Sequence, residues 1–183
     1  MKLFIDTSNN WLILSLISTD NKVVRFKKIE SKNNMVELAN YNLSKFMTPK
    51  EINELDGYIL VNGPGSFTGS KVALNIIKAI DLKLKINKAM VTNSLKLLSD
   101  SKTKYTAIPF GKTKFLFKKN KGIGSSKFKI ITKEKLAKFP TEKVLIGYDK
   151  LNISSLETKF KDRTTFKMIA LDKVEILYSK SII

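Results

Sequence analysis

The sequence contains no cysteine and no histidine among its 183 residues. Without cysteine the chain can form neither disulfides nor thiolate zinc sites, which fits a reducing cytosol. Without histidine it lacks the commonest general base, the commonest metal ligand and every Ser-His or Cys-His nucleophile pair. A metal could therefore be held only by carboxylates, and the chain has just 16 acidic residues.

Long apolar runs are also absent. The longest near the start, from Trp11 to Ile17, is far shorter than the roughly 18 residues that a membrane-spanning helix needs. Asp6 interrupts the apolar start of the chain, so no export signal is recognisable. We therefore expect a cytoplasmic protein that does not enter a membrane. Hydrophobic residues make up 43% of the chain, which is enough to fill the core of one ordinary domain or two small ones.

Negative charge is scarce, and the formal net charge is +18. Nearly all of the basic residues are lysines, 32 of 34, as an AT-rich genome would produce in any protein. The distribution is uneven, however: residues 1–100 have a net charge of +5 and residues 101–183 one of +13. Between Lys102 and Lys138 there are 12 lysines and a single acid, Glu134. Such a one-sided cluster is typical of a surface that binds a phosphate backbone, so both explanations stay open.

The candidate RNA-binding residues in this cluster are Lys112, Lys114, Lys118, Lys119 and Lys121. Lysine gives affinity for phosphates and little base reading, because the planar fork that recognises bases belongs to arginine. The four phenylalanines interleaved with these lysines, Phe110, Phe115, Phe117 and Phe128, could stack on bases. Alternating phenylalanines in a strand are more often core residues, and this second interpretation is the one we favour.

Periodicity predicts a mixed α/β fold. Three apolar or alternating runs, at 3–5, 11–17 and 23–29, indicate successive antiparallel strands. Helical spacing follows at 35–47, and a capping box with Pro49 starts a short second helix. A buried strand at 56–62, a helix at 68–84, a short strand at 89–91 and a helix after 92 complete the first part. After residue 100 the texture changes to short β-like runs, so we predict an N-terminal lobe at 1–100 and a smaller basic lobe at 101–183.

Three glycines lie within seven residues where the fourth strand meets the helix at 68–84. A Walker-type loop needs four residues between its glycines, but Gly65 and Gly69 are separated by three. The dinucleotide fingerprint also fails, because Gly69 comes one residue too late after Gly63 and Gly65, and Pro64 removes one N–H. The segment is better interpreted as a structural turn, with glycines for unusual backbone angles and Ser66 or Thr68 as the helix cap.

Three segments together resemble the TsaB (YeaZ) family of bacterial tRNA threonylcarbamoyladenosine biosynthesis proteins: "LFIDTS", "NGPGSFTGSKVALNIIKAI" and "VTNSLKLLSD". The specific part is the heptapeptide Gly63–Gly69, at the family's usual distance from Asp6-Thr7-Ser8. The resemblance covers roughly residues 1–100. It implies an actin-like (ASKHA) fold of two ribonuclease-H-like lobes, with the second lobe reduced here. Two departures are Ser70-Lys71, where the family usually has Leu-Arg, and Asn33-Asn34-Met35, where it has a His-Ser-Glu entry to the first helix.

The resemblance also implies a function. Members of the family are non-catalytic scaffolds that pair with the catalytic paralogue TsaD and a small ATPase, TsaE, to modify tRNA; homodimers form through the same surface. The first two long helices build that surface, so the expected partner-interface residues are Leu38, Ala39, Leu43, Phe67, Gly69, Lys71, Ala73 and Ile76. We expect no cofactor or metal on this chain alone, although ATP or ADP at the heterodimer interface stays an open alternative.

Two other functions compete with the scaffold. A weak actin-like ATPase would use the residues expected near a nucleotide, Asp6, Thr7 and Ser8. The first hairpin has no glycine to grip a phosphate, and a single carboxylate seldom makes a magnesium site, so we favour a polar cap on the first strand as the role of Asp6. A tRNA-binding basic protein would use the lysine cluster, and this function is compatible with the scaffold.

Overall fold

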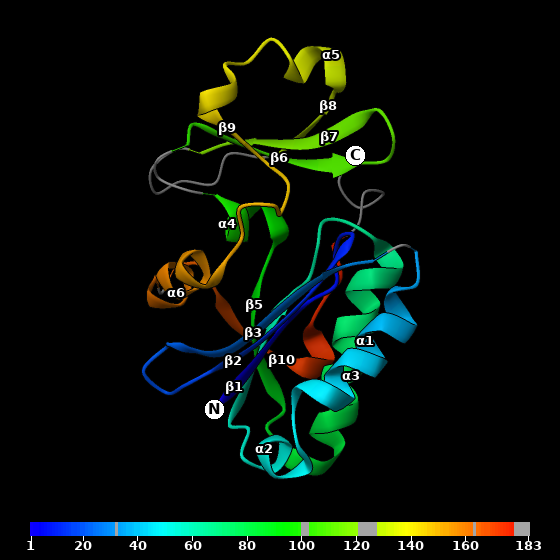
Figure 1. Cartoon of the computed structure of the whole chain (residues 1–183), viewed down its shortest axis with the longest axis vertical. Helices are drawn as coiled ribbons and strands as arrows, with labels where there is room; N and C mark the ends of the chain where they lie inside the picture. The colour runs from blue at the N-terminus through cyan, green and yellow to red at the C-terminus, as the bar shows by residue number, and fades with distance from the viewer. Residues whose placement is uncertain (32, 100–102, 121–127, 163, 178–183) are drawn as a thin grey trace. The chain divides into compact units, whose positions relative to one another are not determined.

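The computed structural model describes residues 1–31, 33–99, 103–120, 128–162 and 164–177, and Lys121 lies outside them (Figure 1). The chain forms two compact units. The first contains residues 1–94 and 152–183, and the second contains residues 95–151. In the described part of the chain, no helix is both long enough and apolar enough to cross a membrane.

A six-stranded sheet with the order β10-β5-β4-β1-β2-β3 forms the frame of the first unit. Its first three strands are antiparallel neighbours, as predicted, while β4 and β5 run parallel to β1. The apolar run at 56–62 is indeed a buried strand next to β1. The strands are β1 (Lys2–Asp6), β2 (Trp11–Ile17), β3 (Val23–Glu30), β4 (Gly57–Val61), β5 (Lys88–Thr92) and β10 (Lys167–Ala170).

Helices cover both faces of this sheet. Alternate residues of β1, Leu3 and Ile5, belong to the core beneath α1 (Met35–Phe46) and α3 (Phe67–Leu84). Phe4 points to the other face, where its ring lies 5.8 Å from that of Phe160 on α6 (Ile153–Lys161). Figure 1 shows α1 and α3 side by side on one side of the sheet and α6 on the other. This period-two burial follows from the alternation of side chains along a strand.

The short helix α2 (Pro49–Asn53) has the predicted capping box. Thr48 accepts a hydrogen bond from the backbone of Glu51, and the Glu51 side chain accepts one from the backbone of Thr48. Arg25 on β3 fixes this helix further, because its guanidinium forms an ion pair of 2.9 Å with Glu51 and donates to the backbone oxygen of Phe46. The end of α1 and the start of α2 are thereby tied to the edge of the sheet.

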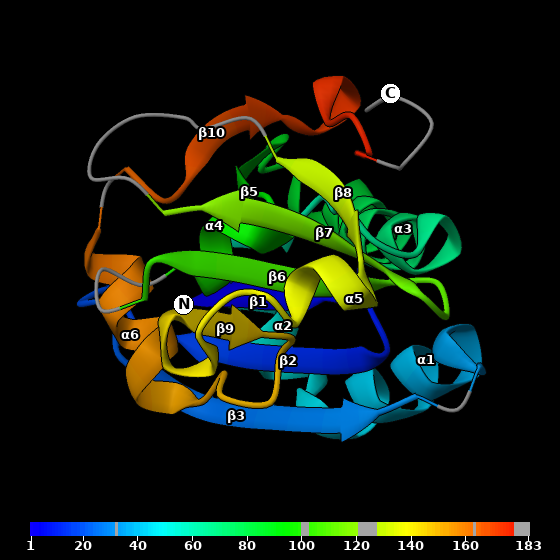
Figure 2. The same cartoon turned by 90° about the horizontal axis from the view of Figure 1, so that it is seen from above.

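The second unit is built on a four-stranded sheet with the order β8-β7-β6-β9. Its core includes Phe117, against which the half-buried Tyr105 and Phe139 pack; the three rings lie 4.7 to 5.1 Å apart. Helix α5 packs on β7 and β8, as Figure 2 shows from above. The elements are α4 (Ser94–Leu98), where the second unit begins, β6 (Tyr105–Phe110), β7 (Lys114–Lys119), β8 (Lys129–Thr132), α5 (Lys133–Leu136), the 3₁₀ turn η1 (Thr141–Lys143) and β9 (Val144–Ile146).

After residue 151 the chain returns to the first unit, a division that differs from the single boundary expected near residue 100. Helix α6 covers the second face of the first sheet, and β10 pairs antiparallel with β5 at its edge before the turn η2 (Leu171–Lys173). Residues 152–183 belong to the first unit because the apolar side chains Leu156 and Phe160 are buried there, at a spacing of one helical turn.

Candidate functional site

The corner between β4 and α3 is held by its three glycines. Ser66 is the N-cap of α3 and accepts a hydrogen bond of 3.1 Å from the backbone N–H of Gly69, so Ser66, not Thr68, caps the helix. Gly63 has a φ of +98°, which side-chain-bearing residues rarely adopt, and a Cβ there would lie 2.2 Å from the carbonyl oxygen of Leu177. The interpretation of this segment as a structural turn is therefore supported by its geometry.

The same corner packs against the loop between β1 and β2. The backbone N–H of Ser66 donates to the carbonyl oxygen of Ser8 over 2.6 Å. A Cβ on Gly65 would lie 1.8 Å from that oxygen, and one on Gly69 would lie 2.0 Å from the carbonyl oxygen of Thr7. Two of the glycines thus allow two backbone segments to touch, which is a reason for glycine that involves no ligand.

The side chains of that loop are hydrogen-bonded inside the first unit. Thr7 Oγ1 donates to the carbonyl oxygen of Gly69 over 2.6 Å and accepts from the backbone N–H of Ala73 over 3.2 Å. Asp6 Oδ1 accepts from the backbone N–H and the hydroxyl of Ser8, at 2.8 and 2.7 Å. The Ser8 hydroxyl also lies 3.0 Å from that of Ser94. All three residues expected near a nucleotide are fully buried, and Asp6 closes its own turn.

Across the described residues, no group of three or more acidic side chains gathers in a way that could hold a metal ion. The parts of an actin-like phosphate site that the structure places together are the Asp6–Ser8 loop and the glycine corner. These bind each other through the contacts above. The function that this arrangement supports is structural: it holds the N-terminus of α3 in place.

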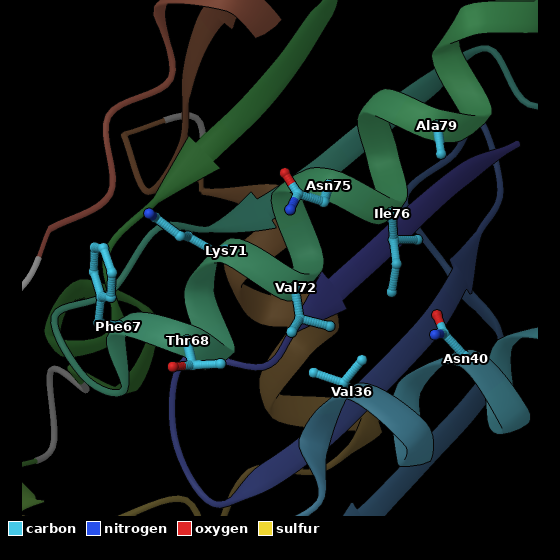
Figure 3. A pocket seen from close by; sticks show the side chains of 9 residues that line it. All are labelled: Val36, Asn40, Phe67, Thr68, Lys71, Val72, Asn75, Ile76 and Ala79. Carbon is cyan, nitrogen blue, oxygen red and sulfur yellow. The ribbon is translucent and has the colours of Figure 1, made fainter.

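A groove of about 430 Å³ runs between α1 and α3 (Figure 3). Aliphatic side chains from both helices line it, Val36 from α1 facing Val72 and Ile76 from α3. Its polar members include Lys71, whose Nζ lies 4.0 Å from the centre of the Phe67 ring. Val36 and Phe67 are each 44% exposed, which is high for large apolar side chains. The full lining is Val36, Asn40, Phe67, Thr68, Lys71, Val72, Asn75, Ile76 and Ala79.

The residues expected at a partner interface divide into three groups. Phe67, Lys71 and Ile76 line the groove, as an interface would require. Leu38 and Leu43 are half-buried and pack against the core. The remaining three, Ala39, Gly69 and Ala73, are buried within the unit, so they offer no surface; they are small where α1, α3 and the Thr7 loop pack closely.

Six groove residues are absent from the expected interface: Val36, Asn40, Thr68, which was expected in the turn, Val72, Asn75 and Ala79. A signal for them exists in the sequence. Val36 and Asn40 are four residues apart on α1, and Val72, Asn75, Ile76 and Ala79 follow the 3–4 spacing of one face of α3. Spacing shows that these residues share a face, but not that two helices leave that face open.

The candidate RNA-binding lysines lie on the second unit. Lys112, Lys114 and Lys119 are exposed, and Lys118 is half-buried. Burial lowers the pKa of the Lys118 ammonium, and the nearby charge of Lys96 lowers it further. Phe117 is in the aromatic core, as the strand interpretation favoured, and Phe115 packs against that core.

No protein-family model and no curated protein matches the sequence. Among solved structures, "YeaZ from Pseudomonas aeruginosa" is similar with a TM-score of 0.69 at 12% identity, over 97% of this chain and 99% of that one. A second, "an uncharacterized protein with similarity to peptidase YEAZ from Pseudomonas aeruginosa", has a TM-score of 0.62 at 13% identity, over 97% and 98%. The chain therefore has the α/β, actin-like fold of YeaZ, and its function is a matter for proposal.

Proposed function

We propose that this chain is a TsaB-type scaffold, a non-catalytic subunit of the complex that makes N6-threonylcarbamoyladenosine in tRNA. In this proposal the α1–α3 groove binds the TsaD-type catalytic paralogue. A TsaE-type ATPase and tRNA join the assembly, and any ATP or ADP sits at the interface between the subunits. The single observation that best supports the proposal is the open groove of apolar side chains between two helices that also bury their inner faces.

The groove is suited to binding a protein because it combines apolar and hydrogen-bonding side chains, as protein interfaces do. Val36, Val72 and Ile76 supply apolar area, while Asn40 and Asn75 supply hydrogen-bonding groups beside it. Phe67, the first residue of α3, is 44% exposed, and the Lys71 ammonium lies over its ring. Exposed aromatics of this kind often become the residues that contribute most to binding.

A scaffold role also agrees with the Asp6–Ser8 loop. In this chain the Thr7 hydroxyl holds the start of α3 through Gly69 and Ala73. The Asp6 carboxylate accepts from Ser8 and fixes the loop itself. By fixing the start of α3, this loop positions Phe67, the first residue of the helix, and Lys71, one turn further along. The residues that would contact a phosphate in an ATPase thus have a role in presenting the groove.

The proposal can be tested by co-purification of the tagged chain from its own cells at moderate salt, with mass identification of what is recovered. We expect a larger, histidine-bearing actin-like paralogue in an amount about equal to that of the tagged chain. Recovery of further copies of this chain alone would indicate a homodimer, and it would contradict the heterodimer. Recovery of RNA alone would contradict it as well.

A further inference from the structure

The second unit has a much higher density of positive charge than the first. It has 15 lysines and 4 acidic residues in 57 positions, a net charge of +11, whereas the first has 19 basic and 12 acidic residues in 126 positions, a net charge of +7. A bias of the genome would act on both units alike. The doubled lysine content of one unit therefore needs a reason that belongs to that unit.

Three exposed lysines of the second unit gather at one end of its sheet. Lys112 lies in the turn between β6 and β7, and Lys114 is the first residue of β7. Lys114 is the pairing partner of Thr132, the last residue of β8. The backbone N–H of Lys133, the first residue of α5, donates to the carbonyl oxygen of Thr113 over 3.0 Å. Chain and strand spacings place the three Cα atoms within roughly 12 Å of one another. We call Lys112, Lys114 and Lys133 the hairpin patch; Figure 2 shows the meeting of β7, β8 and α5 that forms it.

The acid nearest to this patch in sequence does not offset it fully. Glu134 follows Lys133, and its side chain is hydrogen-bonded to Thr132 at the start of α5. That bond lowers the pKa of the Glu134 carboxyl, which stays charged, so the patch has three positive charges against one negative charge. Lys135 and Lys138 follow and are exposed too. The electrostatic potential of this surface is positive, so it attracts a polyanion.

We propose that the hairpin patch binds the phosphate backbone of an RNA. The choice of RNA as the polyanion rests on the proposed function, while the patch itself rests on the charge and the placement described above. Binding should be mainly through phosphates, because lysine ammonium groups contact phosphates and read bases poorly, and the ring of Phe117 is buried against Tyr105 and Phe139. The chain should therefore bind RNA with little sequence preference.

An anionic membrane is the other common partner of a lysine-rich surface, and the structure favours RNA. Surface helices that enter membranes combine cations with exposed apolar anchors. In the described part of the second unit, Ile146 is the one large apolar side chain that is strongly exposed. It lies on β9, at the opposite edge of the sheet from β8. The hairpin patch thus has charge without an apolar anchor.

The test uses the purified full chain alone and a labelled, unmodified tRNA transcript, titrated at several salt concentrations. The variant K112E/K114E/K133E removes the patch. The control K161E/K167E/K173E changes three exposed lysines of the first unit and gives the same net charge, so it separates the patch from the overall charge. K112Q/K114Q/K133Q serves as a second, milder variant should the charge reversal unfold the unit.

We expect the control to bind like the parent and the patch variant to bind about tenfold or more weakly at ~0.1 M salt. The slope of log K against log salt should flatten by about 2 to 3 in the patch variant, roughly one for each phosphate that a lysine no longer neutralises. Equal weakening in both variants, no RNA binding by the parent, or tighter binding to vesicles with anionic lipid than to RNA would overturn the inference. Since no paralogue is present, these outcomes are independent of whether the heterodimer forms.

Discussion

At the scale of single residues, two glycines and one threonine join the Asp6–Ser8 loop to α3. A Cβ on Gly65 or Gly69 would overlap a backbone oxygen, which cannot swing aside as a side chain can. The Thr7 hydroxyl donates to one backbone group of α3 and accepts from another. The segment therefore resembles a phosphate-binding motif in composition, but its glycines and threonine serve the packing of the loop on α3.

Replacing Gly65 by alanine should destabilise the first unit by about 2 to 4 kcal/mol, because the Ser66–Ser8 hydrogen bond must lengthen to admit the methyl group. Gly57→Ala is the matched control: its Cβ would meet the Lys2 side chain at 3.3 Å, so we expect a change within about 1 kcal/mol. Trp11, the only tryptophan, lies in the first unit, and its fluorescence during urea unfolding measures both variants. Equal stability of the two would disprove the close contact.

Replacing Thr7 by valine keeps the shape and removes the hydroxyl that joins Gly69 to Ala73. We expect a loss of about 1 to 3 kcal/mol in the free energy of unfolding, since a buried backbone N–H loses a partner. Thr7→Ser keeps the hydroxyl and should lose less. The same fluorescence titration provides the comparison, and a serine variant less stable than the valine variant would contradict the role of the hydroxyl.

At the scale of elements, α1 and α3 bury Ala39 and Ala73 in one core cluster and leave Val36 and Phe67 exposed along the groove between them. The position of α1 depends in turn on Arg25, which joins its end and the start of α2 to β3. The hydrogen bond from Arg25, with that from the Thr48 backbone, lowers the pKa of the Glu51 carboxyl from 4.5 to about 2.

This pair predicts a pH dependence of stability. A carboxyl whose pKa is lower in the folded state stabilises the fold above its unfolded pKa, and this contribution is lost as the pH falls from about 4.5 towards about 2. In Glu51→Gln that part of the acid sensitivity should disappear. Thermal melts of the parent and the variant between these pH values measure it. An unchanged difference in stability between parent and variant across the window would show that Glu51 has an ordinary pKa.

Most elements of the first 100 residues could be predicted from the sequence, because apolar runs and a helical stripe specify strands and helices locally. The strands β1 to β5 and the helices α1 and α3 lie within a few residues of their predicted positions. The choice of Ser66 over Thr68 as the cap could not be made, since both side chains can bond a helix N-terminus. Which face of α1 and α3 stays open could not be predicted either, because that depends on how two helices pack.

At the scale of the whole molecule, the return of residues 152–177 to the first unit could not be predicted. Strand β10 contributes only four residues, Lys167–Ala170, and its place beside β5 comes from long-range pairing that local patterns do not encode. The return nevertheless determines how charge is divided, because it assigns the lysine-rich stretch to a separate unit of 57 residues. A basic unit and a unit with an open groove are consistent with an assembly that binds RNA and protein at different places.

In the proposed assembly, the α1–α3 groove binds the catalytic paralogue. The most direct measurement is the dissociation constant of the two purified proteins, for the parent chain and for two arginine variants of exposed apolar residues. Val36→Arg changes the groove, and Leu82→Arg changes a residue of α3 that is 73% exposed and outside the groove. We predict a constant weakened by about 30-fold or more for Val36→Arg, and by less than about threefold for Leu82→Arg. Parental affinity in the Val36→Arg variant, with its fold intact, would contradict the claim.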